Sequence, residues 1–400
     1  MVDTTPQQAT RWSVIALVIA SGILASASMG KVPPSLDLLR GEFSIGLVFA
    51  GWIVSVFSAL AMATGAGFGS LPDRFGSRTV ILGGLWIQVV AGIVAVITSS
   101  AHLLLITRLA EGVGFLAVAV AAPGIIVAVS SSRDRNWSLG LWSTYVPAGV
   151  TIAMVTATFT LESIGWRGLW LIFIALVAVV AVACARLLPR IPQKPHKKSA
   201  AGNLFEVMKR PAPWLLAGCF AAYTLMWISI MAWLPTYLID QRGMTAGLAS
   251  LLTAATVASN VPGNLLGTWL LRHSWHGGSI VALSAVVMGG SLFVAFDGSY
   301  SDGVRYGCCL LFSFSGGMLP AAILGTSRLH APDPERIGVV NGIIIQGSHF
   351  GQFIGPPLIA GVVTLQGSWE SSRGLMVSAA LVILMLSVIL YRLERDQSLG

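Results

Sequence analysis

Residues 69–78, GSLPDRFGSR, form a short polar turn between two long apolar runs, at 45–70 and 79–98. Each run is long enough to cross the hydrocarbon core of a bilayer as a helix, which takes about 20 apolar residues. The turn concentrates charge and glycine where two such helices would meet the aqueous phase. The stretch therefore predicts a surface loop joining two membrane-spanning helices.

The composition of the whole chain points the same way. Of its 400 residues, 55% are hydrophobic and only 10% are charged, whereas soluble domains carry about 25% charged residues. The 44 glycines suit membrane helices, because small residues allow close helix packing without a hydrophobic driving force. The net charge of +8 lies mainly in short loops, so we expect no nucleic-acid partner.

Apolar runs predict a regular succession of spans separated by short polar segments. They lie near 12–36, 45–70, 79–98, 101–130, 138–161, 167–188, 213–238, 246–271, 278–296, 303–327, 337–365 and 373–392. The first run is too long for a signal peptide, so we expect it to remain as a span. The pattern predicts an N-terminal six-helix bundle over 1–188, a basic linker over 189–212 and a C-terminal six-helix bundle over 213–400.

Charge bias predicts the orientation. Most of the 24 Lys and Arg residues lie in the linker, near the termini and in the loops expected on that same side. Cytoplasmic loops carry an excess of Lys and Arg. We therefore expect a multi-pass protein of a bacterial cytoplasmic membrane with both termini in the cytoplasm.

The two predicted halves show weak internal similarity. Segment 69–76 follows the second span of the first half, and 267–274, GTWLLRHS, takes the equivalent place in the second. Pro123 and Pro320 lie at similar depths in the fourth and tenth spans. Such repeats are typical of secondary transporters.

The turn at 69–78 resembles the loop signature G-x-L-x-D-R-x-G-R-R/K of the major facilitator superfamily, with Ser77 in place of the usual arginine. The resemblance covers the whole chain. It implies an all-α polytopic membrane protein with 12 transmembrane helices in two pseudo-symmetric six-helix bundles. It also implies a conformational latch at the cytoplasmic rim, formed by Gly69, Asp73, Arg74, Gly76 and Arg78. The alternative is an ordinary turn with solvated charges.

A second charged motif lies inside the fourth span. Residues 108–114, RLAEGVG, resemble the superfamily motif R-x-x-Q/E-G-x-G. An ionised arginine in hydrocarbon costs several kcal/mol, so Arg108 needs a partner or a water-filled cavity. Glu111 lies three residues away on the same helix face. We expect the two to pair, with Glu111 as a candidate for binding the coupling proton; the alternative is that Glu111 only neutralises Arg108.

Lys31 is the other cation within a predicted span. It lies just before Pro33 and Pro34, where we expect the first helix to break. The local pattern is similar to the first helix of sugar and acid permeases of the superfamily, which implies that Lys31 faces the cavity. With Glu111 engaged by Arg108, Lys31 would remain uncompensated and would bind an anion. The alternative is that its side chain reaches the outer surface.

The eleventh span carries further polar candidates. Gln346 and His349 are three residues apart and share a helix face. We expect both to contact substrate, and His349 to serve as a second proton site because imidazole titrates near neutral pH. A histidine in an apolar helix is also compatible with plain packing.

Aromatic residues at similar depths are candidates for the cavity wall: Trp142 and Tyr145 in the fifth span, Tyr223 and Trp227 in the seventh. Packing or interfacial roles are the alternative. The fifth span partly resembles the G-P-x-x-G-G motif of drug antiporters, but Val146 and Val150 replace the expected glycines.

The function predicted is secondary active transport of a small organic anion by proton-coupled alternating access. Enzyme motifs are missing from the sequence, and the four cysteines show no metal or disulfide pattern. We expect no cofactor and no metal; the partners are a small-molecule substrate, protons and the lipid bilayer, and the protein is a monomer. The subfamily suggested is that of cyanate-type porters and other organic-anion carriers. A proton-driven multidrug or metabolite exporter and a transporter-like sensor stay open.

Overall fold

The computed structural model describes residues 9–68, 71–191, 207–331 and 336–399, and within these the chain is entirely helical. The first half contains α1 (Trp12–Gly30), η1 (Pro33–Ser35), α2 (Leu36–Phe43), α3 (Leu47–Ser55), η2 (Val56–Ser58), α4 (Ala59–Phe68), α5 (Leu71–Phe75), α6 (Ser77–Ile97), α7 (Ala101–Val129), α8 (Arg135–Trp142) and α9 (Tyr145–Leu187). The second half contains α11 (Pro211–Arg242), α12 (Ala246–Ala258), α13 (Asn260–Arg272), α14 (Gly277–Ala295), α15 (Asp302–Thr326), η3 (Ser327–His330), α16 (Ile337–Gln366), η5 (Trp369–Ser371) and α17 (Ser372–Leu399).

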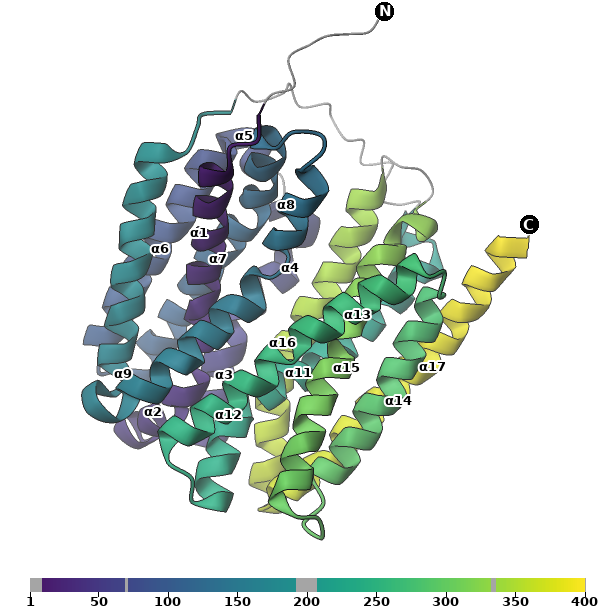
Figure 1. The fold of residues 1–400 in the computed structure, drawn as a ribbon. Helices are drawn as coiled ribbons and strands as arrows, with labels where there is room; N and C mark the ends of the chain where they lie inside the picture. The colour runs from purple at the N-terminus through teal and green to yellow at the C-terminus, as the bar shows by residue number, and fades with distance from the viewer. Residues whose placement is uncertain (1–8, 69–70, 192–206, 332–335, 400) are drawn as a thin grey trace, which may run out of the picture.

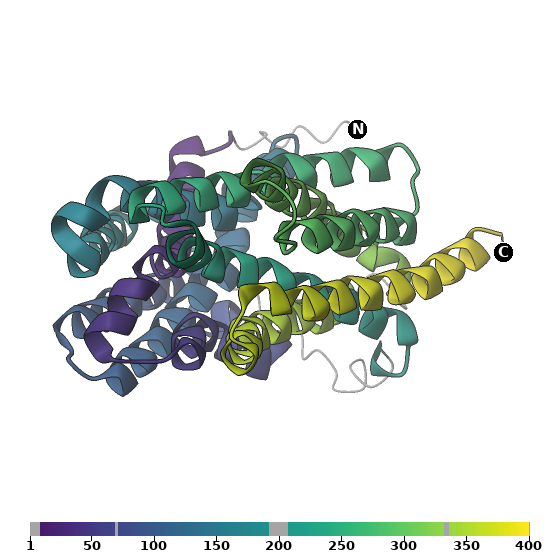
Figure 2. The ribbon, with the colours of Figure 1, turned by 90° about the horizontal axis from the view of Figure 1, so that it is seen from below.

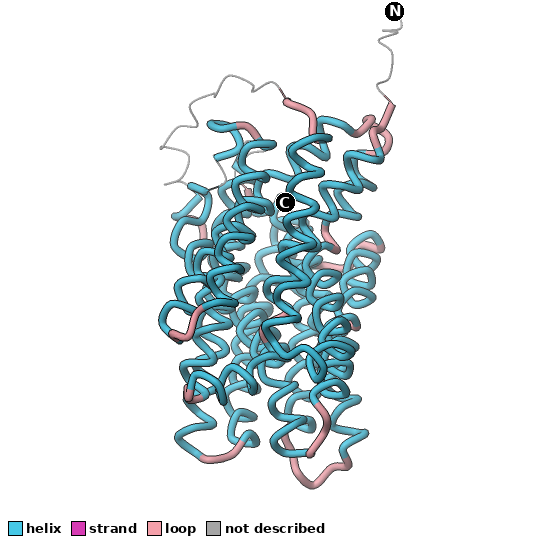
Figure 3. The backbone as a smooth tube through the Cα atoms, turned by 90° about the vertical axis from the view of Figure 1, so that its left-hand side faces the viewer, coloured by secondary structure: helices cyan, strands magenta, loops and turns pink. Residues whose placement is uncertain are grey.

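The helices gather into two groups that lean against each other. Figure 1 shows α1 to α9 on one side and α11 to α17 on the other, and Figure 2 shows the same division from below. The long helices run between two ends of the molecule where the loops lie (Figure 3). The beginning of α1 and the end of α17 lie at the same end (Figure 1).

The predicted spans correspond to helices of the structure. In the described part of the chain, nine helical segments are long and apolar enough to cross a membrane. One of them, Trp137–Leu187, contains two predicted spans, because the chain reverses at Gly165. That reversal needs φ +65°, which glycine adopts without steric cost. The predicted span 246–271 is divided into α12 and α13, and 337–365 corresponds to α16.

The predicted break in the first span is present. Helix α1 ends at Gly30, and Pro33 opens the short 3-10 turn η1 before α2 continues. Proline lacks a backbone N–H and suits the first turn of a new helix. The second span is also broken, at η2, where the sequence gives no proline to signal it. Most of the predicted linker, residues 192–206, lies outside the described residues.

Two glycines let the halves meet closely. A Cβ on Gly51 of α3 would lie 2.8 Å from the backbone of Pro357 on α16. A Cβ on Gly247 at the start of α12 would lie 2.9 Å from the carbonyl oxygen of Thr158 on α9. The contacts of α3 with α16 and of α9 with α12 are therefore backbone-close, as small-residue packing between membrane helices allows.

Candidate functional site

Three ionisable side chains meet inside the first group of helices. Glu111 of α7 accepts a hydrogen bond from the Lys31 ammonium, which lies just past the end of α1, at 2.6 Å between Nζ and Oε1. The other carboxylate oxygen, Oε2, accepts from Arg108 Nη1. Each of the three residues is only 1% exposed. We call Lys31, Arg108 and Glu111 the buried triad; with all three ionised, its formal charge is +1.

This geometry corrects one prediction and extends another. The expected pair of Arg108 and Glu111 is present. Lys31 was expected to be uncompensated and to face the cavity, and this is wrong for the conformation described: Glu111 is within hydrogen-bond distance, and the ammonium is shielded from any solute. Both cations share one carboxylate because each of its two oxygens accepts a hydrogen bond from one of them.

Aromatic rings surround the two cations of the triad. The Lys31 nitrogen lies 4.3 Å from the ring centre of Trp170 on α9. The Arg108 guanidinium lies 4.9 Å from the ring centre of Phe57 in η2. Cations over aromatic faces gain up to about 2 kcal/mol when desolvated. Neither aromatic partner was predicted, because nothing in the local sequence links it to the charges.

Backbone carbonyls and an amide complete the surroundings. Arg108 Nε donates to the carbonyl of Ile53 at 3.3 Å. Gln88 of α6 donates from Nε2 to the carbonyls of Ala25 and Glu111, each at 3.2 Å. The Gln88 side chain is 2% exposed, and its Oε1 has no hydrogen-bond partner. Sequence reasoning missed Gln88, although a lone amide in the apolar run 79–98 was a signal that could have found it.

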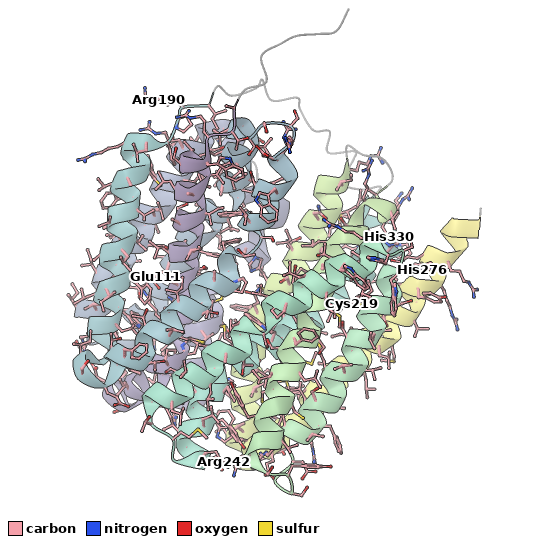
Figure 4. The ribbon with its side chains drawn as sticks, in the orientation of Figure 1. Glu111, Arg190, Cys219, Arg242, His276 and His330 are labelled. Carbon is pink, nitrogen blue, oxygen red and sulfur yellow. The ribbon has the colours of Figure 1, made fainter. Side chains whose placement is uncertain are left out.

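Local structure fixes the positions of the triad residues. The Lys31 backbone N–H donates to the Ala27 carbonyl, and the Ser35 hydroxyl donates to the Lys31 carbonyl at 2.8 Å. On α7, a Cβ at Gly112 would overlap the Phe57 carbonyl oxygen, so only glycine permits this approach to η2. Figure 4 labels Glu111 among the helices of the first group. The triad is thus enclosed by α1, α3, α6, α7 and α9.

The predicted aromatic residues of the fifth span pack on one another. Trp142 stacks on Tyr145 with ring centres 4.2 Å apart, and Tyr145 stacks on Phe115 of α7 at 6.0 Å. Phe115 in turn lies 5.2 Å from Phe57, the ring beside Arg108. A continuous row of rings therefore leads from Trp142 to the triad. A contact of these rings with substrate stays a prediction.

The aromatic residues of the seventh span belong to a polar cluster in the second half. The Asn260 amide donates to the Tyr223 hydroxyl and to the Ser313 carbonyl, both at 3.0 Å. Trp227 donates from Nε1 to the Ser313 hydroxyl at 3.4 Å. Trp227 and Ser313 also line a small cavity, together with Ile230, Met231, Thr256, Val257 and Phe312. Its walls are mainly apolar.

Gln346 and His349 are not brought to the triad, because both lie on α16 in the other half. Gln346 Nε2 donates to the Met62 carbonyl on α4 at 3.1 Å, so it joins the two halves in this conformation. Nearby, the Ser58 hydroxyl donates to Gln352 Oε1 at 2.9 Å. His349 Nδ1 is buried without a hydrogen-bond partner among the described residues. Roles of Gln346 and His349 in substrate or proton binding stay predictions.

The predicted latch is partly visible. Gly69 lies outside the described residues. Asp73 and Arg74 are exposed on α5, and the Arg74 guanidinium lies 5.2 Å from the Phe75 ring centre. Gly76 has φ +83°, as the predicted tight turn requires. Arg78 donates to the Ala185 carbonyl near the end of α9. The latch function itself stays a prediction.

Comparison with protein families gives one match that covers most of the chain. The family model described as Major Facilitator Superfamily matches residues 18–356. A crystal structure of a bacterial homologue of the human lysosomal transporter Spinster, in an inward-facing and unoccupied conformation, superposes with a TM-score of 0.80 at 16% identity and covers 98% of each chain. At that identity the likeness concerns the fold alone.

The relatives that are named for a function are distant in sequence. A methylenomycin A resistance protein of Bacillus subtilis is 26% identical over 48% of this chain and 42% of that protein, so the chain matches less than half of its length. A probable sulfoacetate transporter of Cupriavidus necator is 21% identical over 93% of this chain and 91% of that protein. A methyl viologen resistance protein of Salmonella typhimurium is 25% identical over 44% and 35%.

Proposed function

The chain belongs to the Major Facilitator Superfamily, and we propose that it carries a small organic anion across the cytoplasmic membrane together with protons, by alternating access. Membership makes it a multi-pass secondary transporter and not an enzyme. We propose four further points: that the substrate is an anion, that its transport is coupled to protons, that the membrane is the cytoplasmic one, and that both termini lie in the cytoplasm.

The observation that carries the proposal is the buried triad. Ionised side chains inside a membrane protein are costly, so an intramembrane cluster is by default a functional hypothesis. A cluster with a carboxylate and an amine can bind and release a proton without a cofactor. Because Lys31 lies beside the break at η1 and Glu111 lies on α7, the triad links two separate elements of the first half.

The charge of the triad supports an anionic substrate. A formal charge of +1 in a poorly polarisable interior acts over a long range. At a separation of about 10 Å and an effective dielectric constant of about 20, two unit charges of opposite sign attract by about 1.7 kcal/mol. An anion held between the two halves at that separation would gain this free energy without touching Lys31. The sulfoacetate transporter among the relatives is compatible with such a substrate.

The contacts between the halves support alternating access. Gln346 and Ser58 each bond across the interface of α4, η2 and α16, and the ion pair of Arg40 with Asp240 joins α2 to α11 at 3.7 Å. These interactions are few, and water can hydrogen-bond to their polar groups once the two halves separate. A second conformation in which they are broken is therefore within reach, and a solute or proton that prefers one conformation shifts the balance.

A second candidate function is proton-driven export of a drug or metabolite. The matches to the methylenomycin A and methyl viologen resistance proteins favour it, although each covers less than half of either chain. An exporter of this type would accept a broad range of compounds and would depend little on Lys31.

Reconstituted vesicles separate the two candidates. Purified protein in proteoliposomes with an imposed pH gradient is offered radiolabelled sulfoacetate, a panel of carboxylates, and methyl viologen. Our proposal expects gradient-driven accumulation of at least one anion and none of methyl viologen. Lys31→Met tests the triad in the same assay. Its matched control is Lys209→Met, a change at an exposed lysine. Accumulation of methyl viologen alone, or anion transport that ignores the pH gradient, would contradict the proposal.

A further inference from the structure

We propose that the coupling proton is carried by the Lys31 amine, so that the buried triad alternates between a neutral form and a form of charge +1. This inference rests on the proton coupling proposed above and names the group that performs it. The sequence had suggested Glu111 and His349 for that task. The geometry of the triad favours the amine instead.

The carboxylate is badly placed to take the proton. Glu111 is bonded to a cation at each of its two oxygens, Lys31 at Oε1 and Arg108 at Oε2. Protonation would replace two charge-assisted hydrogen bonds by weaker ones and leave two adjacent buried cations. Such uncompensated buried charge is strongly destabilising. The two ion pairs therefore make Glu111 a poorer proton carrier than the amine beside it.

Arg108 is excluded by its chemistry, because the guanidinium group stays protonated in proteins. Its charge is also matched by one full ion pair with Glu111. Lysine differs, since a buried amine can lose its proton. Of the three groups, only Lys31 can change its charge without leaving an unpaired ion.

The two forms of Lys31 are each supported by the surroundings. The free amine leaves Arg108 and Glu111 as a neutral pair and still has N–H groups to donate to Oε1 at 2.6 Å. The ammonium form gains the attraction of the carboxylate and of the Trp170 ring at 4.3 Å. A carried proton must bind and leave readily, which requires that neither form dominates strongly.

Few other groups bear on this titration. Among the described residues that contact the triad, the charged ones are Arg108 and Glu111 themselves, both on α7. Helix α6 contributes the neutral amide of Gln88, α9 the indole of Trp170, α3 the carbonyl of Ile53 and η1 the hydroxyl of Ser35.

The consequence is a direct link between proton and substrate. When Nζ takes a proton from water on one side, the triad acquires its charge of +1 and attracts an anion between the halves. When the anion leaves on the other side, the charge is again uncompensated and Nζ returns the proton to water. The effect is reciprocal, because a bound anion must favour the protonated amine as much as the proton favours the anion. The expected stoichiometry is one proton for each monovalent anion.

The decisive experiment observes the amine directly and needs no substrate. The chain has five lysines, so ¹³Cε/¹⁵N-lysine labelling of the purified wild-type protein gives a simple NMR spectrum, and Lys31→Arg identifies the Lys31 signal. We expect this signal to move from the free-amine to the ammonium position between pH 9 and pH 5. A Lys31 signal that stays at the ammonium position over the whole range would overturn the inference.

Transport measurements separate this inference from the proposed function. In liposomes loaded with a pH-sensitive dye, external sulfoacetate and carboxylates are the probes. Wild-type protein should move protons together with an anion. In Lys31→Arg the Arg108–Glu111 pair remains, but the guanidinium cannot release its proton. The proton flux of this variant should therefore be at least 10-fold lower than that of the wild type. Loss of coupling in Glu111→Gln with full coupling in Lys31→Arg would sink the inference alone. No proton movement by the wild type with any anion would sink the proposed function.

Discussion

Lys31 and Glu111 are 80 residues apart in the sequence, yet their side-chain atoms Nζ and Oε1 lie 2.6 Å apart in the interior of the first helix group. Both side chains are about as buried as any in the protein, at 1% exposure. This contact turns a helix-local pair, Arg108 with Glu111, into a triad of two cations and one carboxylate. The odd charge is what makes the site a candidate for coupling.

Removal of the carboxylate should destabilise the protein far more than removal of the lysine. When Lys31 is protonated, Glu111→Gln leaves Lys31 and Arg108 as two adjacent buried cations, and breaking a buried ion pair from one side costs about 3 to 5 kcal/mol. Lys31→Met leaves a neutral Arg108–Glu111 pair with a similar side-chain volume. Thermal unfolding followed by tryptophan fluorescence in detergent should show a large fall in Tm for the first variant and a small one for the second.

The double variant tests whether the charges act together. In Lys31→Met/Glu111→Gln only one cation remains, so we expect it to be more stable than Glu111→Gln alone. Residues in direct contact show interaction energies of about 0.5 to 3 kcal/mol in such cycles. Strict additivity of the two single changes would show that the contact contributes nothing to stability.

Two of the three triad residues, Arg108 and Glu111, could be paired from the sequence alone. Arg108 and Glu111 are three residues apart on one helix, and helical geometry alone places them together. The spans and the break at Pro33 follow from hydrophobic runs and from the missing N–H of proline in the same local way. These features depend on residues that are neighbours in the sequence.

Long-range features were not predictable in this way. The partner of Lys31 lies on another helix, and no pattern of neighbouring residues predicts that α1 packs beside α7. The same holds for Trp170 beside Lys31 and for Gln346, whose amide bonds to Met62 in the opposite half. The assumption that Glu111 has one partner failed because a carboxylate offers two oxygens.

Gln88 should be a positioning residue for α7. Its amide joins the Ala25 carbonyl on α1 to the Glu111 carbonyl on α7. Gln88→Leu keeps the volume but leaves two buried carbonyls without these donors, at about 1 to 3 kcal/mol. We expect a fall in Tm and a change in the Lys31 NMR signal. Gln366→Leu, at the exposed end of α16, is the control, and equal effects of the two variants would contradict this role.

Asp134 should anchor the segment just before α1 over a wide pH range. Its Oδ2 accepts hydrogen bonds from the hydroxyls of Thr10 at 2.5 Å and Ser131 at 2.9 Å. The bond from Thr10, followed by that from Ser131, holds the pKa of the carboxyl below its ordinary value. A lowered folded pKa means that the stabilisation is complete above the unfolded pKa, about 3.9, and is lost only as the pH falls through the folded pKa.

Papain should therefore cleave the chain near Arg11 at a rate that, divided by its rate on an unstructured peptide, is the same at pH 5 and at pH 8. Asp134→Ala should expose this segment at both values, because Thr10 and the Ser131 hydroxyl lose their acceptor. Protection that already declines between pH 8 and pH 5 in the wild type would show that another group controls the anchor.

Gly51 should control how closely the two halves meet at α3 and α16. A Cβ there would lie 2.8 Å from the Pro357 backbone, which cannot yield as a flexible side chain can. Gly51→Val should therefore separate the helices and favour the conformation in which this contact is broken. Gly83→Val is the matched control, because a Cβ at Gly83 meets nothing within 4 Å.

Spin labels at Gly41→Cys and Gln241→Cys report on this change, since these exposed positions flank the pair of Arg40 and Asp240 that joins the halves. The distance distribution should shift to longer values in the Gly51→Val background and stay unchanged with Gly83→Val. The shift should also reduce transport, because a carrier held in one conformation cannot complete its cycle even though its triad is intact. An unchanged distribution in Gly51→Val would mean that the contact of α3 with α16 persists in both conformations, and the moving surface would then have to be sought at α9 and α12, where Gly247 approaches Thr158.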